Sequence, residues 1–478
     1  MNKENNNWLV LRRTVLVKAI ETAGVFAVYS PSVLASSDMW IENVTKLYPV
    51  KVSVISSPQT TDEISKSITG HTGKISIGGG RYSMGGQVAI SGGLHLDLRK
   101  FSRLVWFKPE SRRVRVQSGM RWRDLQDIID PHGLSVQTMQ SYSNFTVGGS
   151  LSVNAHGRYV GNGPIVNSVK AISLVLADGS IIETSQSRNA ELFSAAIGGY
   201  GAIGVIAEVE LELVKNVKME RIVQTVELDG YVEFFSNNIK ADKLSIMHNA
   251  DLLPPNFERP IAITWRETDK QLTEEARLTP RDQSYGLEQN VVWTLTELPG
   301  SEKLRKDVIT PLRNAKKIVK WRNHEASLDA AELEPRTRLM STYVLQEYFI
   351  PVRNFEPFAK SMATVLKKYN VEALNVSIRH SPADKVSLLP WAKEEVFSFV
   401  LYFKQRTSEK SKLRVGVWTR ELIDAALSNN GRYYLPYQLH ATKSQFESAY
   451  PEAKELKLIK KKVDPTHKFD NELWKKYL

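Results

Sequence analysis

The feature that most constrains this chain is a short apolar strand followed directly by a run of glycines. Residues 75–87 read Ile-Ser-Ile-Gly-Gly-Gly-Arg-Tyr-Ser-Met-Gly-Gly-Gln. Glycines here let the backbone turn with positive φ and approach a ligand closely. Successive N–H groups in such a turn form a concave site for anionic oxygens, and Arg81 adds a positive charge at its rim. The segment predicts a phosphate site, although a glycine-rich hairpin without a ligand has the same composition.

Two further small-residue segments follow. Phe145 to Gly157 reads Phe-Thr-Val-Gly-Gly-Ser-Leu-Ser-Val-Asn-Ala-His-Gly, and Ile197 to Ile206 reads Ile-Gly-Gly-Tyr-Gly-Ala-Ile-Gly-Val-Ile. Three loops of this kind suit a large ligand with a pyrophosphate better than they suit a single phosphate. None of them fits the strand–GxGxxG–helix fingerprint with an acidic residue about 20 positions later. A nicotinamide-binding Rossmann domain is therefore not expected.

In their order, these segments resemble the FAD-binding domain of the vanillyl-alcohol-oxidase (PCMH-type) flavoprotein superfamily. The resemblance covers Tyr48 to Val214 and the C-terminal tail, and it is closest to aldonolactone and alditol oxidases and to decaprenylphosphoryl-ribose oxidase. It implies FAD as the cofactor. The residues that it implies for FAD binding are Gly78, Gly79, Gly80, Arg81, Tyr82, Ser83, Met84, Gly85, Gln87, Gly119, Thr146, Gly148, Gly149, Ser150, Ser152, Asn154, His156, Gly157, Gly204, Val205 and Ile206.

One position departs from the resemblance in a way that changes the chemistry. Many members of the superfamily have a His before the Ser of the first loop and bond it covalently to the flavin. Tyr82 stands at that position, and the chain contains no cysteine for a second link. Non-covalent FAD is therefore expected, with a tyrosyl link as the alternative.

Length and composition describe a two-domain enzyme. The chain has 478 residues, of which 42% are hydrophobic and 24% charged, values typical of a soluble globular enzyme. The net charge of +12 indicates a solvated basic surface and leaves attraction to anionic substrates or to a membrane surface open. No nucleic-acid-binding motif or basic–aromatic stripe accompanies this charge, so nucleic acid is not an expected partner.

The first 36 residues have the order of a signal segment. Arg12 and Arg13 precede an apolar stretch that ends in small residues near Ala35, an order typical of signal peptides. The paired arginines resemble a twin-arginine export signal, which would take a folded, FAD-loaded enzyme to a bacterial periplasm. Glu21 interrupts the apolar stretch, so an amphipathic first helix on a cytoplasmic protein is the alternative.

Patterning divides the rest of the chain into three parts. Residues 37–215 are expected to form the FAD-binding PCMH-type domain, 216–435 a substrate or cap domain, and 436–478 a return to the FAD domain. The fold class is α+β: a two-subdomain FAD-binding domain plus an α+β cap with an antiparallel sheet. The predicted strands are Lys51–Ile55, Arg113–Gln117, Val169–Leu176, Ile181–Thr184 and Ile203–Val214, and the predicted helices are Thr61–Ile68, Arg123–Ile129 and Phe355–Tyr369.

Two alternating segments of the cap are candidates for the reacting end of the site. Leu345 to Pro351 places Glu347 and Phe349 on one face of a strand and Gln346 and Tyr348 on the other. Asn375 to His380 places Asn375, Ser377 and Arg379 on one face, which fits either a wet pocket or a solvent-facing strand. Sugar-alcohol oxidases have a similar strand with an Arg near the flavin, which favours Arg379. They often carry a Glu where this chain has Ser377.

A third candidate segment is Asn430 to His440. It resembles the region where aldonolactone oxidases and the decaprenyl enzyme place a catalytic Lys, with a His three residues earlier in the former; here these positions are Tyr437 and Tyr434. Gln438 and His440 follow, and His440 is either a base, because its ordinary pKa is near neutrality, or a structural residue. His156 is expected to hold loop backbone or cofactor.

These features predict an FAD-dependent oxidoreductase that oxidises a CH–OH group of a sugar, polyol or aldonolactone-like small molecule and passes electrons to oxygen or a quinone-type acceptor. Two alternatives stay open at this point. One is a flavin-dependent reductase or desaturase of a C=C or lipid-linked substrate. The other is a non-catalytic protein with the FAD-binding fold.

Overall fold

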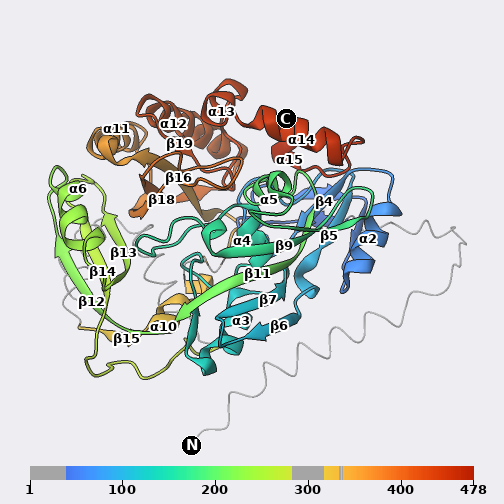
Figure 1. The fold of residues 1–478 in the computed structure, drawn as a ribbon. Helices are drawn as coiled ribbons and strands as arrows, with labels where there is room; N and C mark the ends of the chain where they lie inside the picture. Colours follow the sequence, from blue (N-terminus) through green and yellow to red (C-terminus); the bar gives the residue numbers. More distant parts are fainter. Residues whose placement is uncertain (1–38, 282–316, 333–334, 336) are drawn as a thin grey trace, which may run out of the picture. The chain divides into compact units, whose positions relative to one another are not determined.

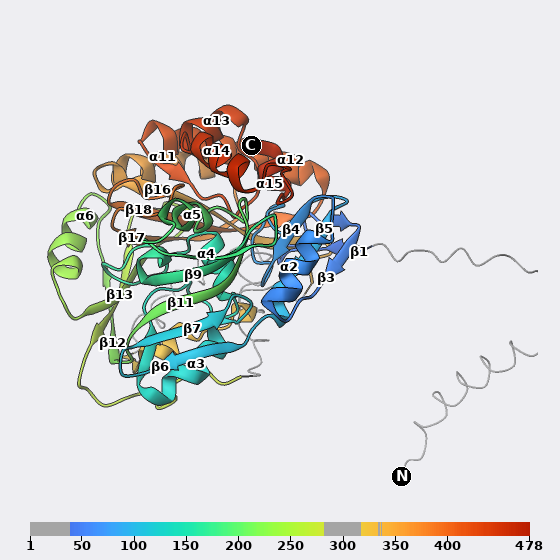
Figure 2. The ribbon, with the colours of Figure 1, turned by 45° about the vertical axis from the view of Figure 1, so that its right-hand side comes forward.

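A computed structural model of the chain describes residues 39–281, 317–332, 335 and 337–478. The predicted signal segment at residues 1–36 lies outside them. The described residues form a mixed helix-and-sheet structure, as predicted, with four sheets (Figures 1 and 2). In both views, β9 (Val169–Val175) and β11 (Val205–Lys215) lie between β16 (Ser341–Pro351) and β18 (Val396–Arg406) on one side and β4 (Ile75–Gly78) and β5 (Leu94–Asp97) on the other.

The first glycine loop leaves a small parallel sheet. This sheet has the order β3-β5-β4, with β3 at Val54–Ser56, β5 at Leu94–Asp97 and β4 at Ile75–Gly78. Helix α2 (Thr61–Thr69) covers it through Ile64 and Ile68, and the Thr60 side chain caps the helix by accepting from the Glu63 N–H. The expected strand over 51–55 is wrong in one respect, because it is divided at Ser53. Residues before Ser53 form β2 (Val50–Val52), which pairs antiparallel with β1 (Met39–Ile41), and residues after it pair parallel with β5.

A six-stranded antiparallel sheet follows, with the order β10-β9-β11-β7-β6 and with β8 paired to β11. The predicted strand Arg113–Gln117 is confirmed as β7, and the predicted hairpin is confirmed as β9 and β10, joined through Gly179 at φ 83°. The elements are β6 (Leu104–Lys108), α3 (Trp122–Ile129), β8 (Leu134–Val136), α4 (Val147–Ser152), β9 (Val169–Val175), β10 (Ile181–Thr184), α5 (Ala190–Ala196) and β11 (Val205–Lys215).

After β11 the chain enters an eight-stranded antiparallel sheet of order β15-β12-β14-β13-β17-β18-β16-β19. Its strands are β12 (Lys218–Thr225), β13 (Ser245–Leu252), β14 (Ile261–Glu267), β15 (Val319–Trp321), β16 (Ser341–Pro351), β17 (Ala373–Ser381), β18 (Val396–Arg406) and β19 (Arg432–Tyr433). The helices of this region are α6 (Tyr231–Phe234), α10 (Arg322–Ala326), α11 (Phe355–Lys368) and α12 (Glu409–Ser428).

The register of the central strands decides which side chains share a face. Glu347 on β16 pairs with Val400 on β18, and Val400 pairs with Ser377 on β17. Tyr348 and Phe399, one position away, lie on the opposite face, and both contact Phe358 of α11 through their rings. One face of the sheet is therefore a hydrophobic core under α11, and the other face carries Glu347.

The C-terminal tail packs on the glycine segments. Its helices are α13 (Lys443–Ala449), α14 (Ala453–Val463) and α15 (Glu472–Tyr477). The buried Lys460 ammonium donates to the Ala202 carbonyl at 2.7 Å and to Asp464 at 2.6 Å. The Trp474 indole donates to the Gly199 carbonyl at 3.0 Å, and the Ile75 N–H donates to the Lys468 carbonyl at 2.7 Å. These contacts fix two of the three glycine segments from outside.

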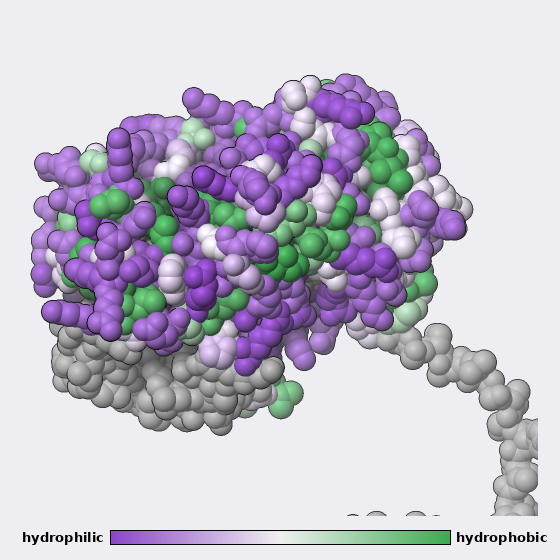
Figure 3. Space-filling view, turned by 60° about the horizontal axis from the view of Figure 1, so that its bottom comes forward, coloured by the Kyte–Doolittle hydropathy of each residue, from purple (hydrophilic) through white to green (hydrophobic). Residues whose placement is uncertain are grey.

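None of the helices in the described ranges is both long and apolar enough to cross a membrane. Figure 3 shows one face of the molecule, on which hydrophilic residues predominate and apolar residues form small separate groups.

Candidate active site

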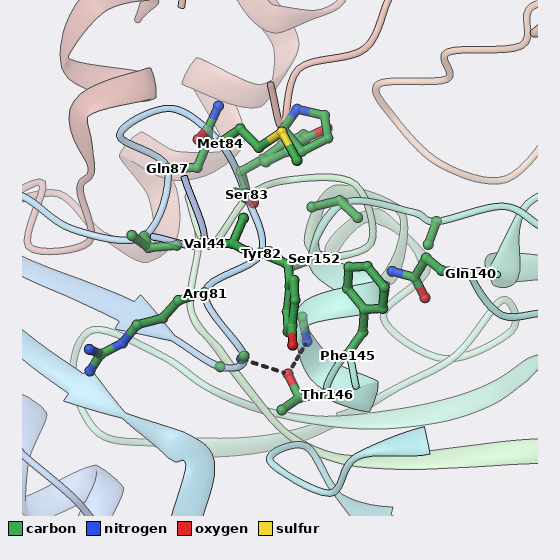
Figure 4. Close-up of a pocket in the computed structure, with 18 of the residues that line it drawn as sticks. Val44, Arg81, Tyr82, Ser83, Met84, Gln87, Gln140, Phe145, Thr146 and Ser152 are labelled. Atoms are coloured by element: carbon green, nitrogen blue, oxygen red, sulfur yellow. Dashed lines mark hydrogen bonds between the residues drawn. The ribbon is translucent and has the colours of Figure 1, made fainter. Parts of the chain in front are cut away.

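A cavity of about 260 Å³ lies where the glycine segments meet the eight-stranded sheet, slightly below the roughly 300–1,000 Å³ usual for small-molecule pockets. Its lining comes from the first glycine loop, from α4 and the loop after it, from residues 200–206, and from β16, β17 and β18. Figure 4 shows the part that the first loop and α4 contribute.

The Thr146 hydroxyl ties the first two glycine segments together. It accepts from the Gly80 N–H at 3.4 Å and from the Gly149 N–H at 3.3 Å (Figure 4). A Cβ added at Gly79 would lie 2.3 Å from this oxygen, so only glycine fits there. The next residue but one, Arg81, has φ 61°. Such a turn directs neighbouring N–H groups to one side, which is the geometry of an anion-binding nest.

The N–H groups of Arg81 and Ser83 make no hydrogen bond to any residue that the structure describes. The Arg81 side chain behaves differently from the prediction of a charge at the rim. Its guanidinium points away from the cavity (Figure 4) and donates to Asp97 at 3.0 Å. Burial acts to raise the pKa of the Asp97 carboxyl, but Arg99 and Arg81 outweigh it and hold that pKa below its ordinary value. The Arg81 backbone, rather than its charge, faces the cavity.

Aromatic and apolar side chains complete this part of the lining. The rings of Tyr82 and Phe145 pack with centroids 4.5 Å apart at 46°, side by side in Figure 4. Leu98, Ile203 and Ile206 add aliphatic surface. The combination of open N–H groups, positions where only glycine fits, and apolar walls fits FAD, whose pyrophosphate needs donors and whose ring system needs flat apolar contacts.

Two thirds of the residues expected to bind FAD line this cavity. They are Gly79, Gly80, Arg81, Tyr82, Ser83, Met84, Gln87, Thr146, Gly148, Gly149, Ser152, His156, Gly204 and Ile206. The structure places the others outside the lining: Gly78, Gly85, Gly119, Ser150, Asn154, Gly157 and Val205.

Several of these outer residues support the lining from behind. The Ser150 hydroxyl accepts from the Trp122 indole at 2.9 Å. Asn154 donates to the Asp384 carboxylate at 2.7 Å. A Cβ on Gly119 would lie 1.8 Å from the Leu98 carbonyl oxygen, so this glycine allows a close approach of two backbones.

The cap sheet contributes a carboxylate that the sequence analysis did not select. Glu347 is the one acidic side chain among the described residues that line the cavity, and it is 3% exposed. Its Oε1 lies 2.5 Å from the His156 Nε2, and its Oε2 accepts from the Tyr437 hydroxyl at 3.1 Å. Burial acts to raise the Glu347 pKa, but His156, Arg379 and Tyr437 outweigh burial and hold it below its ordinary value.

Arg379, which the sequence analysis favoured as a residue near the flavin, lines the same end of the cavity. It forms no hydrogen bond or ion pair with any described residue, and its Nε is buried. Burial lowers the pKa of its guanidinium, while the charge of Glu347 opposes this shift and that of Arg158 adds to it. The predicted neighbour Ser377 is not among the lining residues. The cavity thus obtains its cation from β17 and its carboxylate from β16.

The residues expected from the segment 430–440 separate into two pairs. Tyr434 and Tyr437 line the cavity; the Tyr434 hydroxyl donates to the Val153 carbonyl at 2.8 Å. Gln438 and His440 lie outside the lining. The Gln438 amide bridges the Tyr48 hydroxyl at 2.7 Å and the Gln405 side chain at 2.8 Å.

His440 lies beside Gly416 and Arg420 of α12. Burial, and then the charges of Lys476 and Arg420, lower its pKa to about 4. His440 is not among the residues that line the cavity, and its environment disfavours its charged form.

Comparison with known proteins agrees with the site. Residues 52–185 match the family described as the FAD binding domain. L-gulonolactone oxidase of Mus musculus is 23% identical over 90% of this chain and 96% of its own length. L-gulonolactone oxidase of Bos taurus is 25% identical over 83% of this chain and 88% of its own. Alditol oxidase of a Streptomyces species is 30% identical over 34% of this chain and 38% of its own.

The family match covers the first glycine loop and α4, which are the segments whose backbone and apolar walls fit FAD. The relatives that span most of the chain are oxidases, which agrees with a carboxylate, a phenol and a guanidinium gathered at one end of the cavity. The predictions of FAD and of an oxidoreductase are confirmed: residues 52–185 match an FAD binding domain, and the chain is an FAD-dependent oxidoreductase.

Proposed function

We propose that this enzyme oxidises a CH–OH group of a sugar, polyol or aldonolactone-like substrate. The observation that carries the proposal is the meeting of Glu347, Tyr437 and Arg379 at the end of a cavity whose remaining walls fit FAD. Alcohol oxidation needs a hydride acceptor, a proton acceptor and stabilisation of developing charge in one place. The relatives named for a lactone and for alditols support a polyhydroxylated substrate.

FAD, when bound, supplies the hydride acceptor. The protein supplies the rest. Arg379 is a fixed cation without a partner in the described protein, so its guanidinium is available to negative charge on the substrate oxygen or on the reduced cofactor. Glu347 and Tyr437 accept or hold the proton of the substrate hydroxyl. Tyr343, Leu345 and Tyr402 contribute to the lining of the cavity from β16 and β18.

Anaerobic mixing with a panel of alditols, aldonolactones and free sugars tests this proposal. Bleaching of the flavin absorbance by one of these compounds supports it. Bleaching only by an artificial reduced donor, followed by reoxidation with an enone, would instead establish a reductase. Reoxidation of the reduced enzyme by oxygen and by a soluble quinone then identifies the acceptor, for which we propose one of these two.

We propose that FAD is held without a covalent bond. Tyr82 stands where a linking His would be, and its ring packs against Phe145. Acid precipitation should therefore release yellow cofactor into the supernatant. Flavin that remains with the precipitated protein, on a peptide containing Tyr82, would show the tyrosyl link instead.

We propose that residues 37–215 and 436–478 together make a two-subdomain FAD-binding domain, covered by 216–435. The contacts of Lys460 and Trp474 with residues 199–202 support this division. A crystal structure of the FAD-loaded enzyme tests it: the proposal requires the cofactor to contact both the small parallel sheet and the six-stranded sheet.

We propose that residues 1–36 direct export to a periplasm, on the basis of Arg12 and Arg13 and of the apolar stretch that follows them and ends in small residues near Ala35. Fusion of this segment to a reporter, with both arginines changed to lysine as control, tests the proposal.

We also propose weak association with anionic membrane surfaces through α14, where Leu458 is 63% exposed beside the exposed Lys454, Lys457 and Lys461. Salt-sensitive sedimentation with anionic vesicles tests that association.

A further inference from the structure

We propose that Tyr437 takes the proton of the substrate hydroxyl and passes its own proton to Glu347. This inference rests on the proposed alcohol oxidation and names the two residues that move the proton. Tyr437 is the catalytic residue in contact with the substrate, and Glu347 acts through it.

The hydrogen bonds around Tyr437 indicate the direction of transfer. A phenol has one proton and two acceptor lone pairs. The Tyr437 proton is engaged by Glu347 Oε2 at 3.1 Å. The oxygen is therefore left with acceptor capacity only, and Tyr437 lines the cavity. A substrate hydroxyl that bonds this oxygen must donate its proton to it, which is the orientation that deprotonation requires.

The carboxylate that receives the proton is held at both oxygens. Glu347 Oε1 faces His156 Nε2 at 2.5 Å, and the other ring nitrogen, Nδ1, lies 3.3 Å from the Gly157 carbonyl oxygen. His156 is itself enclosed by the rings of Phe349, Trp391 and Tyr434. Glu347 therefore cannot turn away from Tyr437 without breaking a buried contact.

The surroundings of Glu347 and Tyr437 keep each residue in the protonation state that the proton transfer requires. The titratable groups that act on Glu347 are His156, Arg379, Tyr437, Tyr434, Tyr200 and Tyr450. The first three of these together hold the Glu347 pKa below its ordinary value, so the carboxylate is ionised at neutral pH. Burial, followed by the charge of Glu347, raises the Tyr437 pKa well above its ordinary value, so the phenol keeps its proton until a neighbour accepts it.

Atoms and electrons balance in this step. The substrate C–H bond would break, and FAD, when bound, would supply the acceptor for the hydride with its two electrons. The substrate O–H proton goes to the Tyr437 oxygen as the Tyr437 O–H proton goes to Glu347 Oε2. A C=O bond forms in the product, and Glu347 ends the step as a neutral carboxyl.

The test compares Tyr437→Phe and Glu347→Gln with the parent. The glutamine side chain would keep the shape of the glutamate but could not accept a proton, and the phenylalanine removes the relay oxygen. Loss of a positioned proton acceptor costs about 10²–10⁴-fold. We expect both variants to slow anaerobic flavin reduction at least about 100-fold. The control is Tyr477→Phe, which removes a buried hydroxyl that donates to the Ala441 carbonyl at 2.9 Å outside the cavity lining.

Two further measurements separate proton transfer from a structural role. Reduction of the parent should be slower in D₂O, and this isotope effect should be lost in Tyr437→Phe. The Glu347 pKa is held below the ordinary glutamate value of about 4.3. The parent should therefore slow only when a pH jump passes below this depressed pKa and protonates Glu347, whereas Glu347→Gln should not change. FAD content and thermal unfolding report whether each variant is intact.

The outcomes distinguish the relay from the function. A parent that no alcohol reduces overturns the proposed function. A parent that is reduced, with Tyr437→Phe within about threefold of it and an unchanged isotope effect, overturns the relay while the function stands. If Glu347→Gln does not fold, the result for Tyr437→Phe decides the relay alone.

Discussion

Replacement of Arg379 by alanine removes the one cavity-lining guanidinium that has no hydrogen bond or ion pair within the described protein. In a typical protein such a buried cation has a partner, because an unpaired charge away from water is costly. Arg379 lines the cavity, and the charge of Glu347 acts on it without a hydrogen bond. In the proposed reaction its guanidinium is therefore available to the charge that develops on substrate or cofactor. Arg379→Ala is therefore expected to weaken the reaction more than the fold.

The size of the effect follows from the surroundings of Arg379. Loss of one donor to a developing charge in a water-poor site costs about 10²–10³-fold, or roughly 2.7–4 kcal/mol. The same substitution removes one of the positive charges that hold the Glu347 pKa down, so that pKa should rise toward its ordinary value. We expect Arg379→Ala to slow flavin reduction by about 100-fold. The reduction rate of Arg379→Lys should lie between those of Arg379→Ala and the parent, because lysine keeps the charge but not the planar guanidinium.

Rapid-mixing measurement of anaerobic flavin reduction at saturating substrate checks this expectation, with bound FAD quantified beforehand by its absorbance. Arg414→Ala is the matched control, since Arg414 is exposed on α12 and donates to the Tyr369 carbonyl outside the cavity lining. A reduction rate of Arg379→Ala within about twofold of the parent, at full FAD occupancy, would refute the assigned role of this cation.

Three other substitutions test the binding loops and the tail. Gly149→Val should abolish FAD binding, measured as flavin content after gel filtration. The new side chain would enter the cavity, and its Cβ would lie 2.8 Å from the Thr146 hydroxyl oxygen. The control Gly230→Val, whose Cβ would meet nothing closer than 3.8 Å, should retain FAD. Lys460→Met should destabilise the protein by about 3–5 kcal/mol in denaturant titration, because Asp464, 0% exposed, loses its cation; a loss below about 1 kcal/mol would contradict this. Asp97→Asn should lower the melting temperature at pH 7. The Asp97 pKa is depressed by its arginines, so its contribution is present above the unfolded pKa of about 3.9 and is lost as pH falls through the folded pKa; the two melting temperatures should converge in acid.

The glycine loops could be predicted from the sequence because their signal is local. At Gly79 a Cβ would lie 2.3 Å from Thr146, and at Gly148 it would lie 2.5 Å from the Ser118 Cβ. A position that has no room for a Cβ requires glycine, so the requirement can be read from the local sequence without knowledge of the rest of the fold. The strand β7 and the hairpin of β9 and β10 are equally local, since alternation and an Asp-Gly turn specify them.

Glu347 could not be selected in this way. Alternation along 345–351 separated its face from that of Tyr348, but both residues are buried, at 3% and 1% exposure. In a central strand the two faces are equally hidden from solvent, so burial does not tell which one meets the cavity. Only the packing of α11 on the Tyr348 face, through Phe358, leaves the Glu347 face to the cofactor side.

The position of His440 could not be predicted from the sequence for a different reason. Its distance of three residues from Tyr437 suggested a shared site, but β19 ends at Tyr433 and the following chain is irregular, so side-chain direction no longer follows a period. Tyr437 turns toward Glu347, while His440 lies against α12 beside Arg420. Residues close in sequence can be assigned to a common face only within a regular helix or strand.

The placement of the carboxylate shows why transfer of single positions from relatives reaches a limit here. Glu347 and Ser377 stand at the same level of the sheet with β18 between them, which separates their backbones by about 10 Å at roughly 4.8 Å per strand. A carboxylate on β16 therefore cannot occupy the space of one on β17. It makes different contacts, with His156 and Tyr437, and these come from two segments that a strand-by-strand comparison treats separately. The proposed reaction requires a proton acceptor beside a cation in the cavity, and the tertiary structure brings Glu347 of β16 and Arg379 of β17 to the same cavity.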